Sequence, residues 1–412
     1  MESGARADRR RRLSLSLLWQ GQLVSSLGDA VYRIALGFWL LAETGSTAIT
    51  GATLAASMLP RIFLSPVAGA AVDRLSRKRI LVAADVLCGA AVLLVGVAAA
   101  LGALEVWMLV SAALALGVGA AFFTPALETV LPELVPRGAL TRVNAAFSFA
   151  CTGAELVGSS AGGFAFVALG APALFLFDGL SFACSAALTL FAKLPPPPPV
   201  EKARDGLAAQ LRQGLAAMRG SPGLAGLIAA SCVANLLTAA AAFSVLAFCE
   251  RRDDLGPEAY GLLMAALSAG AIAGYLAVAA KAIPAPRRFA AFCGSGVLLG
   301  VSLAIFPHLP GLTGMLPLTA AAGFAISVTG TLFTTALQLS VPAADRGKVL
   351  GLRAALMTAM VPVGIAAAGC AAEAIDPAIT TSAAALAIAV TYAATSPSKS
   401  VRGILSSGEG AP

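Results

Sequence analysis

The stretch from Gly69 to Arg79, GAAVDRLSRKR, decides how this chain folds. It places an aspartate and four cations between two long apolar runs. Because so many charged side chains cannot lie in hydrocarbon, the stretch must be a tight loop at a membrane surface that joins two spanning helices. Gly69 lets these helices approach closely, and Asp73 can cap or neutralise a neighbouring helix start. A cytoplasmic position of the loop is indicated by its basic residues Arg74, Arg77, Lys78 and Arg79.

The composition is that of a membrane protein. Of the 412 residues, 58% are hydrophobic and 12% are charged, whereas about a quarter of the residues of a soluble domain are charged. The net charge of +7 does not indicate nucleic-acid binding, because the cations lie in short loops between apolar runs. The sequence has no Gly-rich phosphate loop that would indicate ATP as the energy source. Seven scattered cysteines and the single His308 argue against a metal site.

Twelve membrane spans are expected, each of about 20 mostly apolar residues. The first apolar run follows several arginines, as in a signal peptide. However, it is too long and carries Asp29 and Arg33, so we expect a retained helix. The fold class is therefore all-α and integral to the membrane. The expected spans are 15–42, 48–71, 80–102, 105–128, 144–169, 172–192, 224–249, 258–280, 288–306, 312–338, 350–371 and 377–395.

The basic residues assign the two sides of the membrane. Of the 28 lysines and arginines, 24 fall on the side of the N-terminus when successive loops are assigned alternately. Arg251 and Arg252 fall on the other side, next to Asp253 and Asp254. Losing or adding one span would destroy this asymmetry. We therefore expect both termini in the cytoplasm and the chain in the cytoplasmic (inner) membrane.

The chain consists of two similar halves. Val-Pro and then a cation followed by Val occur in segment 135–143 and again, 206 residues later, in segment 341–349. Two parallel six-helix halves are typical of many secondary transporters. We expect an N-terminal half at 1–192, a cytoplasmic linker at 193–223, a C-terminal half at 224–395 and a cytoplasmic tail at 396–412. The linker holds a polyproline run and, at 205–219, an amphipathic helix expected on the membrane surface.

Charged residues near mid-membrane are candidates for proton coupling and for the transport cavity. They are Asp29, Arg33, Arg61 and Glu155. At about 1.5 Å per residue, Asp29 lies roughly 21 Å and Glu155 roughly 17 Å from the inner end of its helix. Arg33 follows Asp29 by four residues and is expected to neutralise it, which leaves Arg61 to serve Glu155 or to compete for Asp29. A carboxylate left without a cation can bind and release a proton. The alternative is static pairing of all these groups.

The two halves differ in their buried charge. The first half has two further acids within spans, Asp85 and Asp178, so its acids outnumber its in-span arginines. Asp85 is expected to be a static group that reaches a loop cation, either Arg77 or Arg142. The second half has no acid at mid-span. Its polar candidates for the cavity are Asn235 and Thr238.

Several motifs resemble those of one transporter family. The loop at 69–79 resembles the signature loop between helices two and three of the major facilitator superfamily. The glycines Gly158, Gly162 and Gly163 lie in a pattern similar to the antiporter motif of drug exporters in this superfamily, with Ser159 in the place of its proline. From about residue 13 to 370 the chain is similar to the macrolide-efflux and enterobactin-exporter branch. The motifs are WQGQ (19–22), SSLGD (25–29), LPR (59–61), LPELVP (131–136) and DGLSF (178–182).

This resemblance implies an alternating-access secondary transporter of the major facilitator fold. It also implies export of an amphipathic small organic molecule, such as a drug, an antibiotic or a siderophore, by proton antiport. The implied partners are the cargo, protons and the lipid bilayer. We expect no cofactor, metal or nucleic acid, a monomeric state, and no enzyme activity.

The signature loop is implied to be a conformational latch made by Gly69, Asp73, Arg74, Arg77 and Lys78. Asp73 is expected to pair with Arg77 or to meet the start of helix eleven near Arg353. Asp73→Asn should then leave the protein folded and inserted but shift it toward the inward-open state, measured as cysteine accessibility from the cytoplasm. If the loop only sets the topology, the substitution is silent.

Three other functions remain open. A lipid or lysolipid flippase has the same fold, and transport tests with labelled lipids would distinguish it. A membrane enzyme would need a catalytic cluster near one surface, such as paired histidines, and the sequence has a single histidine. A transport-dead sensor would keep the fold, although Asp73 and the mid-membrane acids weigh against it, and a flux assay decides.

Overall fold

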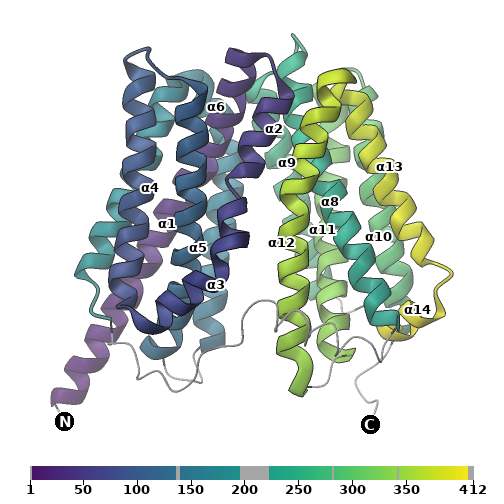
Figure 1. Cartoon of the computed structure of the whole chain (residues 1–412). Helices are drawn as coiled ribbons and strands as arrows, with labels where there is room; N and C mark the ends of the chain where they lie inside the picture. The colour runs from purple at the N-terminus through teal and green to yellow at the C-terminus, as the bar shows by residue number, and fades with distance from the viewer. Residues whose placement is uncertain (1, 136–139, 195–221, 281–282, 341–342, 407–412) are drawn as a thin grey trace. The chain divides into compact units, whose positions relative to one another are not determined.

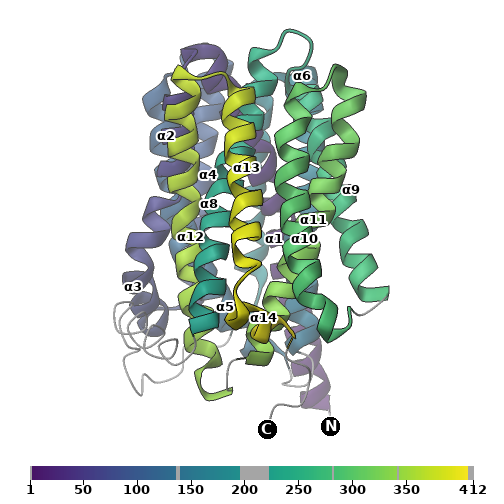
Figure 2. The same ribbon diagram turned by 90° about the vertical axis from the view of Figure 1, so that its right-hand side faces the viewer.

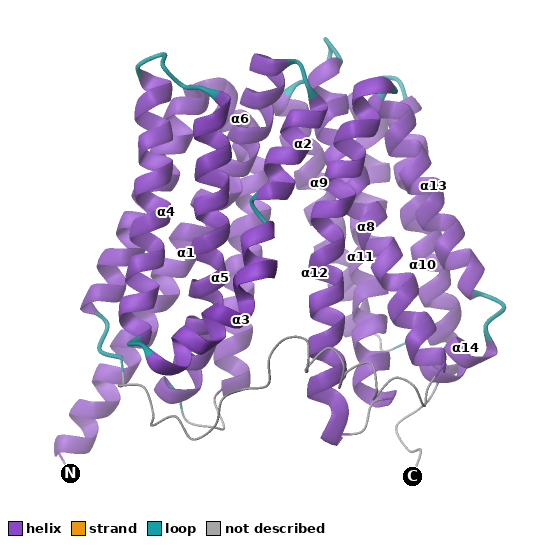
Figure 3. Cartoon of the chain, viewed as in Figure 1, coloured by secondary structure: helices purple, strands orange, loops and turns teal. Residues whose placement is uncertain are grey.

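The structure is a computed structural model of the chain, and it describes residues 2–135, 140–194, 222–280, 283–340 and 343–406 (Figure 1). Within these ranges the regular elements are helices, and no strand occurs (Figure 3). The expected linker helix at 205–219 lies outside the described residues. By length and composition, 11 of the described helices are apolar enough to cross a membrane.

The helices follow the apolar runs of the sequence. The earlier ones are α1 (Glu2–Thr44), α2 (Thr47–Ala56), α3 (Leu59–Arg74), α4 (Arg77–Ala100), α5 (Val106–Leu134) and α6 (Leu140–Phe191). The later ones are α8 (Pro222–Arg251), α9 (Pro257–Ala280), α10 (Ala285–Ile305), α11 (Gly311–Ser340), α12 (Ala343–Ala374), α13 (Pro377–Thr395) and α14 (Lys399–Ser406). The helix α14 lies in the expected tail.

The element α6 contains two of the expected spans, 144–169 and 172–192. They are separated at Gly170, whose φ of 75° and ψ of 166° are not helical. A residue with a Cβ is strained at this φ, and Pro172 then stands near the start of the second helix, where a proline fits. The turn therefore divides α6 into two spans. With this division the helices match the twelve that the sequence predicts.

The span predicted as one helix at 48–71 consists of two helices, although the segment Thr47–Leu64 is long and apolar enough to cross a membrane. α2 ends at Ala56, and α3 begins at Leu59 with Pro60 in its first turn. A proline inside a helix lacks the N–H that the ladder needs, and its ring clashes with the carbonyl four residues earlier. The chain therefore turns at Ser57 and Met58. The carbonyl of Ser57 lies against Gly117 of α5, where a side chain would clash with it.

The first compact unit comprises Met1–Glu43 and Ala56–Arg204. In it α4 packs against α5 and α6, and α3 packs against α5. Its core near the signature loop is apolar and includes Leu18, Leu81, Val130, Leu131 and Phe147.

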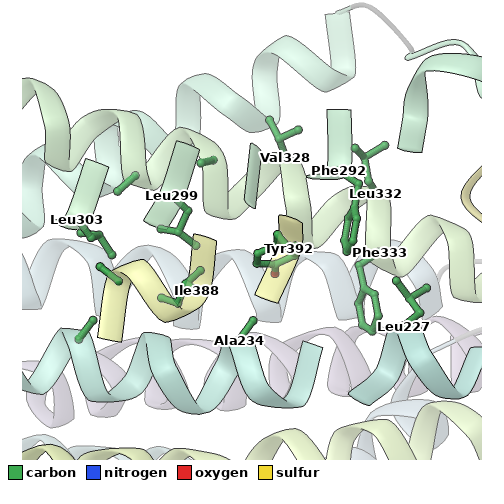
Figure 4. Close-up of a cluster of buried hydrophobic side chains, with 14 of the residues drawn as sticks. Leu227, Ala234, Phe292, Leu299, Leu303, Val328, Leu332, Phe333, Ile388 and Tyr392 are labelled. Atoms are coloured by element: carbon green, nitrogen blue, oxygen red, sulfur yellow. The ribbon is translucent and has the colours of Figure 1, made fainter. Parts of the chain in front are cut away.

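The second compact unit comprises Thr44–Ala55 and Asp205–Pro412, so it includes most of α2, which the sequence analysis places in the N-terminal half. α11 packs against α9 and α10, while α13 packs against α8 and α10 (Figure 2). Its core contains Leu299, Ile388 and Tyr392 (Figure 4). The rings of Phe292 and Tyr392 meet edge to face, with centroids 5.3 Å apart. These contacts bury apolar faces of α10, α11 and α13 against one another.

The loop between α8 and α9 neutralises one of its own cations. Arg252 donates from Nε to Oδ1 of Asp254 over 2.9 Å and from Nη2 to Oδ2 over 2.7 Å. These hydrogen bonds hold the pKa of Asp254 below its ordinary value. Gly256, at a φ of 88°, then turns the chain into α9. The local balance between Arg252 and an aspartate is the one that the sequence predicts for this loop.

Candidate functional site

An ion pair inside the first unit joins α1 to α6. Arg33 Nη2 lies 2.8 Å from Glu155 Oε1, although the two residues are 122 positions apart. Arg33 stands 11 residues before the end of α1 at Thr44, which is roughly 16 Å from that end at about 1.5 Å per residue. The structure therefore brings together two of the four mid-membrane charges that the sequence predicts.

This pairing corrects the predicted one. The four-residue spacing along α1 predicts Arg33 as the partner of Asp29, with Arg61 left for Glu155. The hydrogen bond of Arg33 goes to Glu155, because the glycine face of α6 packs closely on α1. Asp29 still lies within electrostatic reach of Arg33 and Glu155. Arg61 is exposed on α3 and makes no ion pair with any described residue.

The ion pair is exposed although it lies within spans. The side chains of Arg33 and Glu155 are 47% and 60% exposed. A charged group that faces hydrocarbon at this depth costs about 2.5 kcal/mol or more of free energy. In membrane proteins such groups therefore usually face the bundle interior or a water-filled cavity. A place for Arg33 and Glu155 in the transport cavity stays a prediction.

Two glycines of α6 make this approach possible. At Gly158 a Cβ would lie 2.6 Å from the Cβ of Ala30, and at Gly162 it would lie 3.1 Å from Ile34. Both are buried, as is Gly163. Small residues therefore let α6 and α1 pack closely, as the motif predicts. This packing brings Glu155, one turn before Gly158, to Arg33.

Two further carboxyl groups of the first unit are buried. Asp178 of α6 is fully buried; Ser181 Oγ lies 3.3 Å from its Oδ1, and its Oδ2 has no hydrogen-bond partner. Asp178 interacts electrostatically with Asp29 and Arg33. Asp85 of α4 is also buried and is hydrogen-bonded to Ser185. The first unit thus holds three neighbouring aspartates, of which Asp29 is half-buried and the others are buried.

Gly28 leaves room for the Asp178 region next to α1. A Cβ at Gly28 would lie 2.5 Å from Asp178 Oδ1 and would clash with Ser181. We expect Gly28→Val to destabilise the first unit by about 1–3 kcal/mol, because the added methyl groups force the packed helices apart. The measurement is the thermal unfolding of the purified protein. Gly153→Val is the matched control, since a Cβ there meets no atom within 4 Å. A Gly28→Val protein that melts like the wild type would contradict the close packing, and Ser181→Gly should partly rescue it.

The signature loop is held by contacts to other helices. The buried guanidinium of Arg77 forms an ion pair with Glu133 near the end of α5. Of the two cations predicted for Asp85, Arg77 and Arg142, Arg77 therefore has Glu133 as its partner. Lys78 Nζ donates to the carbonyls of Leu190 and Ala192 at the end of α6, over 2.6 and 2.8 Å. The side chains of Asp73 and Arg74, as well as Gly69, lie outside the described residues, so the latch role of Asp73 stays a prediction.

The sequence analysis missed the role of Glu133, although the residue lies in one of its motifs. An acid at the end of a spanning helix can pair with any of the cations in the loops on the same side of the membrane. Its partner Arg77 is 56 residues away, so sequence spacing gives no signal for this pair. Packing of α4 against α5 is what joins them.

The polar candidates of the second unit are engaged in helix contacts. Asn235 Nδ2 donates to the carbonyl of Met357 over 2.7 Å and so links α8 to α12. Thr238 donates to the carbonyl of Ala234 in its own helix. Both side chains are partly exposed, so a role in the cavity stays a prediction. Arg353 lies over the ring of Phe333, 4.5 Å from its centroid.

Glu373, near the end of α12, binds the start of α2. Its Oε2 accepts hydrogen bonds from Ser46 Oγ, Thr47 Oγ1 and the backbone N–H of Ala48, over 3.1, 3.0 and 3.1 Å. The carboxylate thus satisfies a free donor of the first turn and complements the helix dipole. The sequence analysis did not find this contact, because more than 320 residues separate the partners.

Glu373→Ala is expected to loosen α2. The first-turn donors lose their acceptor, so amide hydrogen exchange in residues 47–53 should speed up roughly fivefold or more, since one lost hydrogen bond of this kind corresponds to about 1 kcal/mol. Mass spectrometry of peptides from the exchanged protein measures this. Glu258→Ala, in the first turn of α9, is the matched control. Unchanged exchange in α2 would show that Glu373 does not hold this helix.

Among the described residues, no group of histidine, cysteine, aspartate or glutamate side chains is arranged to hold a metal ion.

Long apolar helices, close glycine contacts and a charged pair exposed within spans are the features of a polytopic membrane transporter. The family model of the Major Facilitator Superfamily matches residues 18–367. The chain belongs to the Major Facilitator Superfamily, a superfamily of transporters, as the sequence motifs predict. Its twelve-helix, all-α fold class is confirmed.

Several curated proteins are similar in sequence. The chain is 30% identical to the multidrug efflux pump Tap of Mycobacterium tuberculosis over 360 residues, 84% of each chain. It is 28% identical to Tap of Mycolicibacterium fortuitum over 367 residues, 87% of this chain and 89% of that protein. Macrolide efflux protein A of Streptococcus pyogenes is 35% identical over 131 residues, and that alignment spans only 32% of either chain.

Solved structures share the fold at low sequence identity. A bacterial homologue of the human lysosomal transporter Spinster aligns with a TM-score of 0.67 at 14% identity, covering 96% of this chain and 97% of that one. The POT family transporter PepTSo aligns with a TM-score of 0.68 at 10% identity, covering 93% and 97%. At these identities the likeness concerns the fold alone.

Proposed function

We propose that this protein exports an amphipathic small organic molecule across the cytoplasmic membrane and takes up protons in exchange. The observation that carries the proposal is the similarity to the efflux pump Tap over most of both chains, which the macrolide efflux protein supports in part. An amphipathic cargo fits both the macrolide named for one relative and the range of drugs implied by the name of the other. The protein acts as a monomer with both termini in the cytoplasm.

The coupling in this proposal resides in the first unit. Asp29 is half-buried and lies within electrostatic reach of the Arg33–Glu155 pair. If Arg33 moves between the two carboxylates during the cycle, each acid loses its cation in turn and can take up a proton. Arg61, exposed on α3, supplies a second cation for the acid that Arg33 leaves. The polar side chains of Asn235 and Thr238 line the cargo path in the second unit, and the loop with Asp73 acts as the latch.

The test is transport in proteoliposomes with an imposed pH gradient. The purified protein is reconstituted with a fluorescent cationic dye or a radiolabelled macrolide, and flux is followed with and without the gradient. Gradient-stimulated flux of either cargo supports the proposal. Flux that ignores the gradient would remove proton coupling. Movement of a labelled lysolipid without movement of dye or macrolide would favour the flippase, and the absence of any flux would favour the sensor.

A further inference from the structure

The second unit contains a cavity that the transport proposal does not use. It has a volume of about 620 Å³ and lies among α9, α10 and α11. α9 and α10 each pack against α11, which contributes Phe324 and Val328 to the lining of the cavity. Its size falls within the range of about 300–1,000 Å³ that is usual for small-molecule sites.

The cavity is apolar apart from one end. Phe324 and Val328 line it on α11, and small residues such as Ala277 and Gly294 leave the space between its walls unfilled. The hydroxyl of Ser295 is engaged with Thr329 Oγ1 at 2.7 Å. Such a surface suits a hydrocarbon chain, because the polar atom at its wall already has a partner.

Arg287 makes the one polar end of the cavity and lies in the first turn of α10. Its side chain is exposed, and its guanidinium forms no ion pair or side-chain hydrogen bond with any described residue. The first turn of α10 carries no acidic residue that would compete for it. A guanidinium binds a phosphate through two parallel hydrogen bonds, so this end suits an anionic head group.

We propose that this groove binds one anionic phospholipid, with the phosphate on Arg287 and an acyl chain over Phe324 and Val328. The occupant follows from charge complementarity, since an apolar channel with the guanidinium of Arg287 at its end matches a lipid with a charged head and an apolar tail. The sequence places this end of α10 on the cytoplasmic side, where basic pockets between spans meet anionic lipids. The site goes beyond the transport proposal and does not depend on it.

The test uses the full chain in nanodiscs that contain a phosphatidylglycerol with a photoreactive diazirine in its acyl chain. Crosslinks are mapped by peptide mass spectrometry and are expected on the segment of α11 that contains Phe324 and Val328. Arg287→Ala should reduce them roughly tenfold, the size expected for losing a charge-assisted hydrogen bond. The matching phosphatidylcholine probe carries the same phosphate together with a compensating ammonium group, so it should give weaker crosslinks that Arg287→Ala reduces less.

Filling the groove provides an independent variant. A Cβ at Gly294 meets no atom within 4 Å, so Gly294→Leu should fold and displace the acyl chain. Ala290→Leu, on the same wall, serves if that variant elutes as an aggregate. Arg79→Ala and Gly403→Leu are the controls for lost charge and added volume, since both positions are exposed elsewhere.

Equal crosslinking by both lipid probes, unaffected by Arg287→Ala, would overturn the proposal. So would α11 crosslinks that persist in Gly294→Leu. If the wild type is a dimer and Gly294→Leu is a monomer, the groove is assigned to a second copy of the chain. If dye or macrolide protects α11 from crosslinking and unlabelled phosphatidylglycerol does not, the groove is assigned to cargo. Either result also overturns lipid binding.

Discussion

Arg33→Gln is expected to abolish the stimulation of export by a pH gradient. Arg33 forms the ion pair with Glu155 and lies within electrostatic reach of Asp29. Its loss leaves both carboxylates without the cation that would neutralise one of them at a time. Coupling between two ligands typically amounts to about 1–3 kcal/mol, so a stimulation of roughly 5- to 150-fold should disappear. The measurement is cargo flux in proteoliposomes with and without the gradient.

The exposure of the pair makes this a test of function rather than of folding. Both side chains are about half exposed, and an ion pair of this kind contributes only about 0–1 kcal/mol to stability. Arg33→Gln should therefore purify and melt like the wild type. Arg33→Lys keeps the charge and should retain part of the stimulation. Arg251→Gln, at the exposed end of α8, is the matched control for a lost cation.

A second variant keeps the positive charge of Arg33 but removes its partner in the ion pair. Glu155→Gln removes the acceptor of Arg33 and leaves Asp29 and Asp178 as carboxylates within its electrostatic reach, so we expect reduced but measurable gradient stimulation. Full gradient-driven flux in Arg33→Gln would exclude the ion pair from coupling. Normal flux in Arg33→Gln together with loss in Arg61→Ala would assign the coupling cation to α3.

The second large effect is expected at Asp29. Asp29→Asn preserves the shape of the side chain but cannot release a proton, so gradient stimulation should fall to the basal flux, again roughly 5- to 150-fold. Cargo binding, measured by dye fluorescence or by scintillation proximity with the labelled macrolide, should remain within about threefold of the wild type, since less than about 1 kcal/mol of binding is at stake.

Asp178→Asn is the matched control in the same unit. Asp178 is fully buried, whereas Asp29 is half-buried, and only a carboxyl that meets water at some stage can exchange a proton with it. We therefore expect Asp178→Asn to retain gradient stimulation. The opposite pattern, with coupling lost in Asp178→Asn and kept in Asp29→Asn, would move the proton site to α6. Full stimulation in both Asp29→Asn and Glu155→Gln would remove these two acids from coupling.

The sequence alone determined the membrane class and the order of the spans. These follow from features of single segments: the length of each apolar run and the cations of the loops. The motif at 69–79 was sufficient to predict the family, because its glycine, aspartate and arginines are spaced along one stretch of chain. The break at Pro60 was also readable in principle, since a proline disrupts a helix wherever it occurs in the interior. The long apolar run around it obscured this signal.

The tertiary structure alone decided which charged groups meet. Helical spacing identifies neighbours on one helix and so predicts Asp29 for Arg33. The bond to Glu155 depends on the face of α6 that packs against α1, which Gly158 and Gly162 set. The pairs of Arg77 with Glu133 and of Glu373 with the start of α2 also join distant parts of the chain. Periodicity fixes which residues share a face of a helix, but the partner of that face is chosen by the fit of side chains between helices, which no local pattern records.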